Sequence, residues 1–131
     1  MKVGDVISWE RSFTPSDVKN FSELSGDWGR HHTIPDDCGR LVVQGLLTAT
    51  LPTKLGGDLN VLARNMEFTF LRPVYTGDVI RCEATITQYE RQTAKIRIAS
   101  VFACYNQDGG KVMEGSFQGV IKQSEEEQSI R

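Results

Sequence analysis

The segment LVVQGLLTATLPTKLGG (residues 41–57) constrains the fold of this chain more than any other. It is apolar nearly all round, and its single charge is that of Lys54. A helix that is hydrophobic on every side has to be buried, with other elements wrapped around it. We therefore expect a buried helix from about residue 44 to residue 55. An interior proline removes a backbone hydrogen bond, so Pro52 predicts a bend, and Gly56-Gly57 should close the helix.

Four segments with a two-residue period follow this helix and predict strands. The first runs to Arg72-Pro73, and the others cover residues 79–89, 94–105 and 112–122. The turns between them are TGD at 76–78 and NQDGG at 106–110. The side chains expected to share a face within each strand are Leu62, Met66, Phe68 and Phe70; Ile80, Cys82, Ala84 and Ile86; Ile96, Ile98, Phe102 and Cys104; and Met113, Phe117 and Ile121.

The segment before the buried helix predicts a strand, a helix and a loop. Residues 6–13 alternate in polarity, and Thr14 and Pro15 then give the N-cap and first position of a helix that ends at Ser25-Gly26. Residues 27–40 (DWGRHHTIPDDCGR) are polar and contain both histidines of the chain. Polar, glycine-containing loops are common sites of binding and catalysis.

This order of elements predicts an α+β protein with one hot-dog domain over residues 1–122. In that fold a curved antiparallel sheet wraps around a long buried helix. The acidic segment 123–131, with three consecutive glutamates, is predicted to be a disordered tail. Such a small sheet leaves an exposed edge, which favours a homodimer or a dimer of dimers.

Composition excludes several classes of protein. The formal net charge of the 131 residues is −2, which gives no attraction to nucleic acid or to an anionic membrane. No apolar run approaches the roughly 20 residues that cross a bilayer. The first residues lack the apolar core of a signal peptide, so we expect a cytoplasmic protein. The three cysteines are widely spaced, without a CxxC pair, which argues against a disulfide framework or a zinc ribbon.

Three blocks of sequence resemble the MaoC-like (R)-specific enoyl-CoA hydratases. They are FSELSGD (21–27) followed by His32, VQGLLTA (43–49), and FLRPVYTGD (70–78). Their order matches that family, whose corresponding patterns are F-x-x-L-S-G-D-x-N-P-x-H, V-H-G-M-L-x-A and F-x-x-P-V-x-x-G-D. The resemblance implies the hot-dog fold and the reversible hydration of 2-enoyl thioesters, which in reverse dehydrates (3R)-3-hydroxyacyl thioesters.

The resemblance implies that Asp27 and His32 form the catalytic pair. Hydration needs a base that takes a proton from water as it attacks C3, and an acid that delivers a proton to C2. A carboxylate and an imidazole that converge on one water supply both, each contributing roughly 10²–10⁴-fold. No metal or redox cofactor is expected, because coenzyme A or acyl carrier protein is part of the substrate.

Gly45, Gln44 and Thr53 are the expected substrate-binding residues. The Gly45 amide, at a helix N-terminus, can bind the thioester carbonyl, although a packing role would also explain this glycine. Gln44 stands where the family usually has the histidine of its H-G pair. Thr53 aligns with a family serine that supports the catalytic acid; an ordinary helix hydroxyl bonded to its own backbone is the alternative.

Departures from the family pattern leave other functions open. Gly29-Arg30 replaces the family's Asn-Pro, and only 12 positions separate His32 from Gln44. One alternative is an acyl-CoA thioesterase with Asp27 as base, and another is a non-catalytic acyl-thioester-binding protein. A metal site of His31, His32 and residues 36–38 is disfavoured, because adjacent histidines point apart in an extended chain and the spacing matches no common zinc pattern.

Four basic side chains are candidates for binding the phosphates of coenzyme A or the acidic surface of an acyl carrier protein. They are Arg40, Lys54, Arg64 and Arg72. Scattered charges are more often a solvated surface, and the sequence alone does not group these four.

Overall fold

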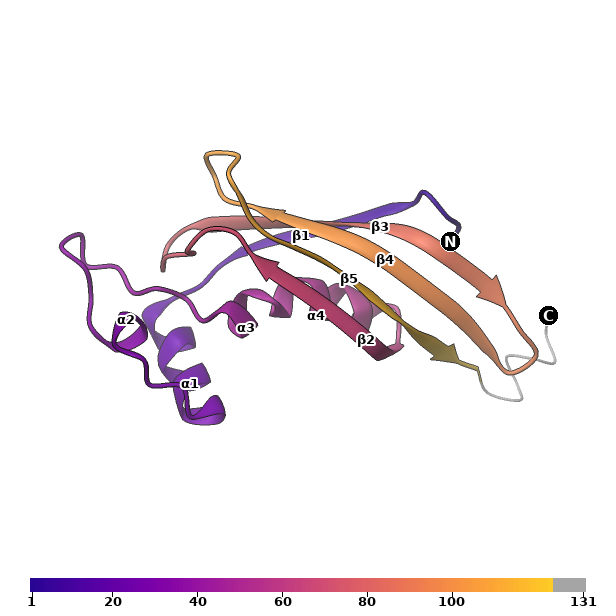
Figure 1. Ribbon diagram of the computed structural model, residues 1–131, viewed down its shortest axis with the longest axis horizontal. Helices are drawn as coiled ribbons and strands as arrows, with labels where there is room; N and C mark the ends of the chain where they lie inside the picture. The colour runs from indigo at the N-terminus through magenta and orange to yellow at the C-terminus, as the bar shows by residue number, and fades with distance from the viewer. Residues whose placement is uncertain (124–131) are drawn as a thin grey trace.

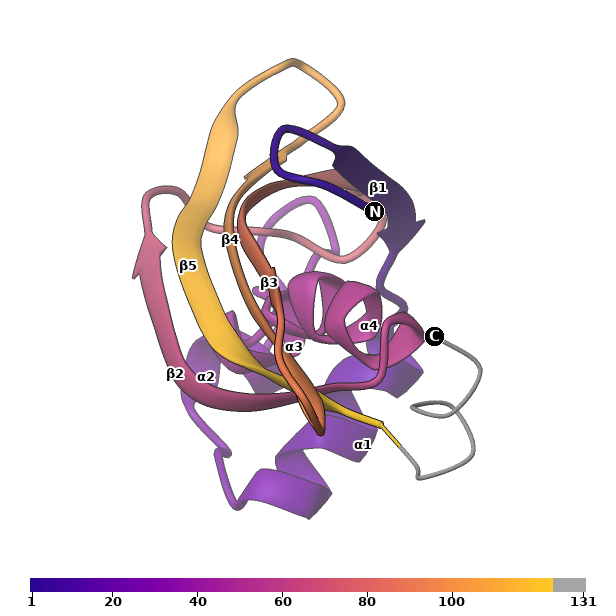
Figure 2. The same cartoon turned by 90° about the vertical axis from the view of Figure 1, so that its right-hand side faces the viewer.

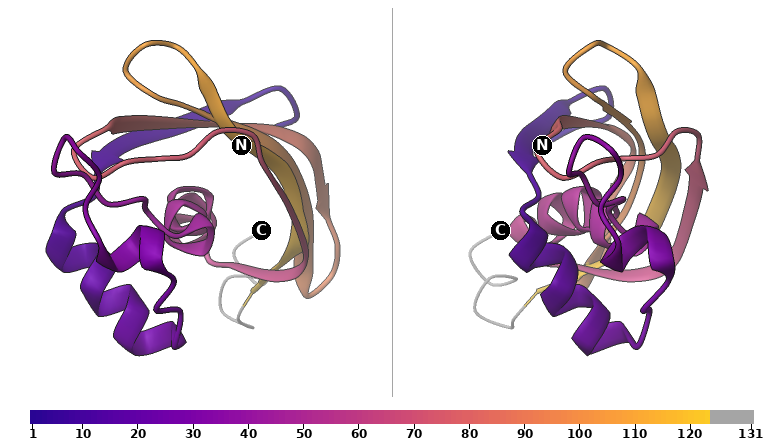
Figure 3. Two further views of the ribbon diagram at one scale, coloured as in Figure 1. Left: turned by 60° about the vertical axis from the view of Figure 1, so that its left-hand side comes forward. Right: turned by 90° about the vertical axis from the view of Figure 1, so that its left-hand side faces the viewer.

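The computed structural model describes residues 1–123 and has one curved five-stranded antiparallel sheet (Figure 1). Along the chain the elements are β1 (Val6–Ser12), α1 (Pro15–Ser25), α2 (Arg30–Thr33), α3 (Gly45–Thr48), α4 (Thr50–Asp58), β2 (Val61–Phe70), β3 (Val79–Arg91), β4 (Lys95–Tyr105) and β5 (Lys111–Lys122). The strand order is β1-β3-β4-β5-β2. Seen along α4, the sheet curves around the helix, which confirms the expected α+β hot-dog fold (Figure 3, left). The predicted tail lies outside the described residues, apart from Gln123.

The concave faces of β3 and β4 contribute buried side chains to the core, as the alternation of their side chains predicts. Ile80, Cys82, Ala84, Ile86, Ile96, Ile98, Phe102 and Cys104 are all buried. Cys82 lies directly opposite Cys104, and both are free thiols. The hydrogen bond with Cys82 and burial raise the pKa of the Cys104 thiol, so it stays protonated and behaves as a core side chain.

The prediction that Leu62 shares a face of β2 with Met66 and Phe68 is wrong. A β-bulge between Ala63 and Asn65 shifts the register against β5. Leu62 pairs with Val120, whereas Met66 pairs with Phe117, three positions away on β5. Because side chains alternate along a strand, the bulge places Leu62 on the convex face and Met66 on the concave face.

The buried helix is interrupted at Ala49 and continues to Asp58, so the expected single helix and its limits need correction. Pro52 has no N–H to offer the carbonyl of Thr48, four residues earlier, and its ring crowds that carbonyl. The break therefore precedes the proline by about one turn. Gly56 and Gly57 lie inside α4 rather than closing it.

The helix is also covered on one side only. Leu51, Pro52 and Leu55 are buried, while Thr53 and Lys54 are exposed. Figure 2 shows α4 within the curve of the sheet and α1 beneath it.

Helix α1 is anchored to the start of α3 by a buried glutamine. The Gln44 side chain is 1% exposed, and its Nε2 donates to the Val18 carbonyl at 3.0 Å and to Ser22 Oγ at 2.9 Å. Val18 and Ser22 are the buried residues of α1. This contact fixes the end of α1, and with it the loop that follows, relative to the N-terminus of α3.

Candidate active site

Asp27 is oriented by the end of helix α1. Gly26 ends the helix with φ of 79°, a left-handed conformation that glycine adopts without strain. The Asp27 amide then donates to Ser25 Oγ at 3.1 Å, and Asp27 Oδ1 accepts the Gly29 amide at 3.1 Å. With Oδ1 engaged, Oδ2 is the oxygen directed at His32.

His32 is 6% exposed and lies on the single turn α2. Its Nδ1 lies 2.6 Å from the Val42 carbonyl oxygen, which can only accept, so Nδ1 carries the proton. In the neutral ring, Nε2 is then a proton acceptor. The Val42 contact thus selects the tautomer that leaves Nε2 free to act as a base.

The structure brings the two predicted catalytic residues together. Asp27 Oδ2 lies 3.3 Å from His32 Nε2, and the Asp27 side chain is 50% exposed. Two acceptors this close suit either a shared proton or a water that donates one hydrogen to each of them. Either Asp27 Oδ2 or His32 Nε2 can therefore take a proton from such a water and later donate it.

Gly29 occupies a position where a side chain would disturb this pair. A methyl group there would lie 3.0 Å from His31 Cε1, 3.3 Å from Asp27 Oδ1 and 3.4 Å from His32 Cδ2. The same residue donates its amide to Asp27. Gly29, which departs from the family pattern, therefore holds the carboxylate through its backbone N–H.

The pair lines a cavity of about 700 Å³. Its apolar lining residues include Phe21, Val42, Val43, Leu46, Phe70 and Val74. Gly45 and Gln44 line the same cavity, as do Thr48, His31 and Arg72. Sequence reasoning missed Thr48 and Phe70 as lining residues, because nothing in their spacing separates them from core positions.

Gly45 is the first residue of α3, and its amide makes none of the hydrogen bonds that residues 1–123 form. A methyl group on Gly45 would lie 2.8 Å from Cε1 of Phe70. The close ring explains why a glycine fits here, and the unbonded amide of this cavity-lining residue is a candidate donor for a bound carbonyl.

Two buried oxygens of the cavity lining have no hydrogen-bond partner within the described residues. They are Gln44 Oε1 and Thr48 Oγ1. Gln44 Nε2 already donates to two α1 acceptors, so the amide orientation is set and Oε1 can only accept. Gln44 is thus both a structural tether and a polar group of the lining.

Thr53 is not brought to this cavity. Its hydroxyl donates to the Ala49 carbonyl at 2.8 Å, as the ordinary helix alternative describes. No three His, Cys, Asp or Glu side chains between residues 1 and 123 are grouped closely enough to hold a metal ion. Over the same residues, no helix has the length and apolar character that a membrane span requires.

One family model and one curated relative match part of this chain. A family model described as the Thioesterase superfamily matches residues 41–100. The mitochondrial 3-hydroxyacyl-[acyl-carrier-protein] dehydratase of Arabidopsis thaliana is 31% identical over 87 residues, or 61% of this chain and 52% of that protein. This chain therefore spans about half the length of that relative.

Solved structures agree on the fold. A protein from Archaeoglobus fulgidus has a TM-score of 0.79 at 27% identity, covering 94% of this chain and 80% of its own. An (R)-hydratase from A. caviae involved in PHA biosynthesis has a TM-score of 0.78 at 23% identity, covering 94% and 98%. The (R)-hydratase, at 23% identity, supports the fold, and the dehydratase relative confirms the resemblance that the three sequence blocks indicate.

Proposed function

We propose that this hot-dog chain adds water reversibly to 2-enoyl thioesters of coenzyme A or acyl carrier protein. In reverse it dehydrates (3R)-3-hydroxyacyl thioesters. The observation that carries this proposal is the 3.3 Å approach of Asp27 Oδ2 to His32 Nε2 in the wall of a largely apolar cavity. The unbonded amide of Gly45, a residue that lines the same cavity, supports it, because hydration needs a donor where negative charge develops.

In this mechanism one water donates a hydrogen bond to Asp27 Oδ2 and another to His32 Nε2. Its lone pair attacks C3 of the enoyl group as one of the two acceptors takes a proton. The negative charge that moves to the thioester oxygen is stabilised by the Gly45 N–H. The abstracted proton then passes to C2 from the same side, which gives syn addition. No cofactor other than the thioester carrier takes part.

The proposal includes a homodimer that pairs through β2, which assembles further into a dimer of dimers if a second face is used. Strand β2 is at one edge of the sheet, so its outer backbone groups have no strand partner within residues 1–123. Leu62, Met66 and Phe70 on this strand are exposed at 54%, 38% and 51%. A long edge strand with exposed apolar side chains favours pairing with a second copy. A cytoplasmic location stays a prediction.

Thioester hydrolysis is a second candidate, favoured by the family model that matches residues 41–100. In this reaction Asp27 activates water for attack on the thioester carbonyl instead of C3. Both reactions use the same cavity, so only an assay separates them.

The test compares hydration of crotonyl-CoA with hydrolysis of acyl-CoA by the purified protein. We expect hydration to be faster, and Asp27→Asn to lower its kcat by about 10²–10⁴-fold, the usual contribution of a general acid or base. Asp36→Asn, in the neighbouring loop, is the matched control and should keep full activity. Faster hydrolysis would replace the proposal with the thioesterase, and binding without either reaction would favour a non-catalytic protein.

A further inference from the structure

The structure separates the four basic residues that the sequence offers as phosphate binders. Arg40 Nη2 pairs with Asp36 Oδ2 at 2.9 Å, and its guanidinium stacks 3.9 Å above the centre of the Tyr75 ring. Lys54 pairs with Asp58 one turn further along α4. Each of these two cations already neutralises a carboxylate, which leaves Arg64 and Arg72.

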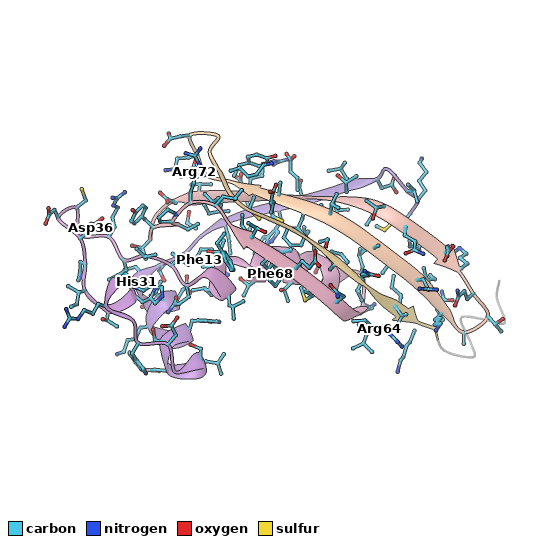
Figure 4. The ribbon with its side chains drawn as sticks, in the orientation of Figure 1. Phe13, His31, Asp36, Arg64, Phe68 and Arg72 are labelled. Atoms are coloured by element: carbon cyan, nitrogen blue, oxygen red, sulfur yellow. The ribbon has the colours of Figure 1, made fainter. Side chains whose placement is uncertain are left out.

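Arg64 and Arg72 lie near opposite ends of β2 (Figure 4). Arg64 lines a separate small hollow with Lys95 and Arg97. Arg72 lines the cavity that contains Asp27 and His32. Of the four candidates, only Arg72 is therefore placed to contact a ligand bound at the catalytic pair.

Arg72 is exposed and free of carboxylates. It takes part in none of the ion pairs or side-chain hydrogen bonds formed within residues 1–123. Its backbone is nevertheless held, because its amide donates to the Val112 carbonyl at 3.3 Å and Pro73 follows it. The Arg72 side chain lies beside Gly110, where an added methyl group would be in ordinary van der Waals contact with Arg72 Cδ, at 3.5 Å.

We infer that Arg72 binds the phosphate at the end of the pantetheine arm of the thioester carrier. This inference rests on the proposed function for the identity of the ligand. The arm is uncharged between its sulfur and its phosphate, so the phosphate is the first negative charge that a thioester bound at Asp27 presents. A guanidinium donates two parallel hydrogen bonds to phosphate oxygens, which a carboxylate-free arginine at the cavity supplies.

Coenzyme A and acyl carrier protein share this phosphate ester, so the site recognises chemistry common to both carriers. Asp27, His31 and His32 are the other ionisable side chains of the cavity lining. Asp27 faces His32, so no lining carboxylate competes for Arg72.

The experiment measures steady-state hydration of crotonyl thioesters that differ only in their carrier. The substrates are crotonyl-CoA, crotonyl-acyl carrier protein, crotonyl-4′-phosphopantetheine and crotonyl-pantetheine, the last without phosphate. We expect Arg72→Ala to raise KM for the three phosphorylated substrates by about 10-fold or more with kcat unchanged, as the loss of a charge-assisted hydrogen bond does. KM for crotonyl-pantetheine should not change, and the carrier with the lower wild-type KM is the one the protein uses.

Arg64→Ala is the matched control, because it removes an equal charge far from the cavity. It should leave all four KM values unchanged. An equal rise in KM for crotonyl-pantetheine would overturn the inference, as would no effect of Arg72→Ala. An effect confined to crotonyl-CoA would also overturn it, by assigning the contact to the nucleotide phosphates.

Binding measurements separate this inference from the proposed function. Calorimetry with 4′-phosphopantetheine and with pantetheine needs no turnover. If wild-type protein fails to hydrate crotonyl thioesters but loses 4′-phosphopantetheine affinity on Arg72→Ala, the proposed function fails and the phosphate site stands. If hydration occurs and the variant binds 4′-phosphopantetheine as tightly as wild type, the phosphate site fails alone.

Discussion

Thr48 contributes a buried hydroxyl that has no hydrogen-bond partner within residues 1–123. The residue is 2% exposed, so water does not replace that partner freely. A valine has nearly the same shape and no polar atom. Thr48→Val should therefore raise the free energy of unfolding by about 1 kcal/mol, measured by urea denaturation. Thr53→Val, which removes a hydroxyl bonded to the Ala49 carbonyl, should bring no such gain. A destabilised Thr48→Val protein would show that this hydroxyl has a partner in solution.

A substitution at Gly45 tests whether catalysis needs the space that the missing side chain leaves beside Phe70. An added methyl group meets the Phe70 ring at 2.8 Å, so the ring or the start of α3 has to shift. We expect Gly45→Ala to lower kcat/KM for crotonyl-CoA by about 10²-fold, as an ångström-scale misplacement of a catalytic group does. The double variant Gly45→Ala, Phe70→Ala removes the obstructing ring and should recover most of the activity. Failure of this rescue would show that glycine is needed for a reason other than the Phe70 contact.

Helix α1 depends on a capping box that titrates. The Thr14 N–H donates to Asp17 Oδ2 at 2.8 Å, and the Asp17 N–H donates to Thr14 Oγ1 at 3.1 Å. The bond from the Thr14 backbone, then the Thr14 hydroxyl and Arg11, lower the pKa of Asp17. A lowered folded-state pKa means that ionised Asp17 stabilises the fold above its unfolded pKa, and that this contribution is lost as pH falls through the folded pKa.

Asp17→Asn should accordingly destabilise the protein at pH 7 by about 0.5–1 kcal/mol, a small value because the Asp17 side chain is still 32% exposed and solvent screens its charge. The difference between variant and wild type should shrink when urea unfolding is repeated below the lowered pKa of Asp17. Asp5→Asn, outside α1, is the control for the loss of one charge. A difference that persists unchanged at low pH would assign the effect to helix propensity instead of charge.

At this same scale, regular elements are readable from the sequence and irregular ones are not. The buried faces of β3 and β4 follow from strict alternation along most of their length. The face of Leu62 does not, because the bulge near Ala63 depends on the pairing with β5, which local sequence does not specify. Pro52 predicts a disturbance of the helix, but its steric effect is on the carbonyl four residues earlier, so the break lies at Ala49.

The sequence predicts the candidate site only in part, as it does the helices and strands. Asp27 and His32 were found through the family blocks, since a five-residue spacing across a loop does not by itself imply contact. Their orientation by the Gly29 amide and the Val42 carbonyl could not be predicted, because backbone hydrogen bonds leave no residue-type signature. Arg72 was one of four equivalent cations until the fold placed the other three elsewhere or beside carboxylates.

At the scale of the whole molecule, the edge strand β2 is the proposed contact between two copies of the chain. In a two-fold dimer paired through β2, both subunits use the same patch, so each exposed side chain of β2 enters the interface twice, once from each subunit. Met66→Lys would bring two like charges into this interface. We therefore expect the dissociation constant Kd of the dimer to rise at least tenfold, measured by light scattering across a concentration series. Val101→Lys places the same charge on the exposed side of the central strand β4 and should leave the dimer intact.

Phe70 lies on β2 and also lines the cavity, so a dimer through this edge would cover the same apolar side chain that the substrate contacts. Loss of the dimer should then raise KM for crotonyl-CoA in Met66→Lys and not in Val101→Lys. A Met66→Lys protein that stays dimeric would place the interface on another face.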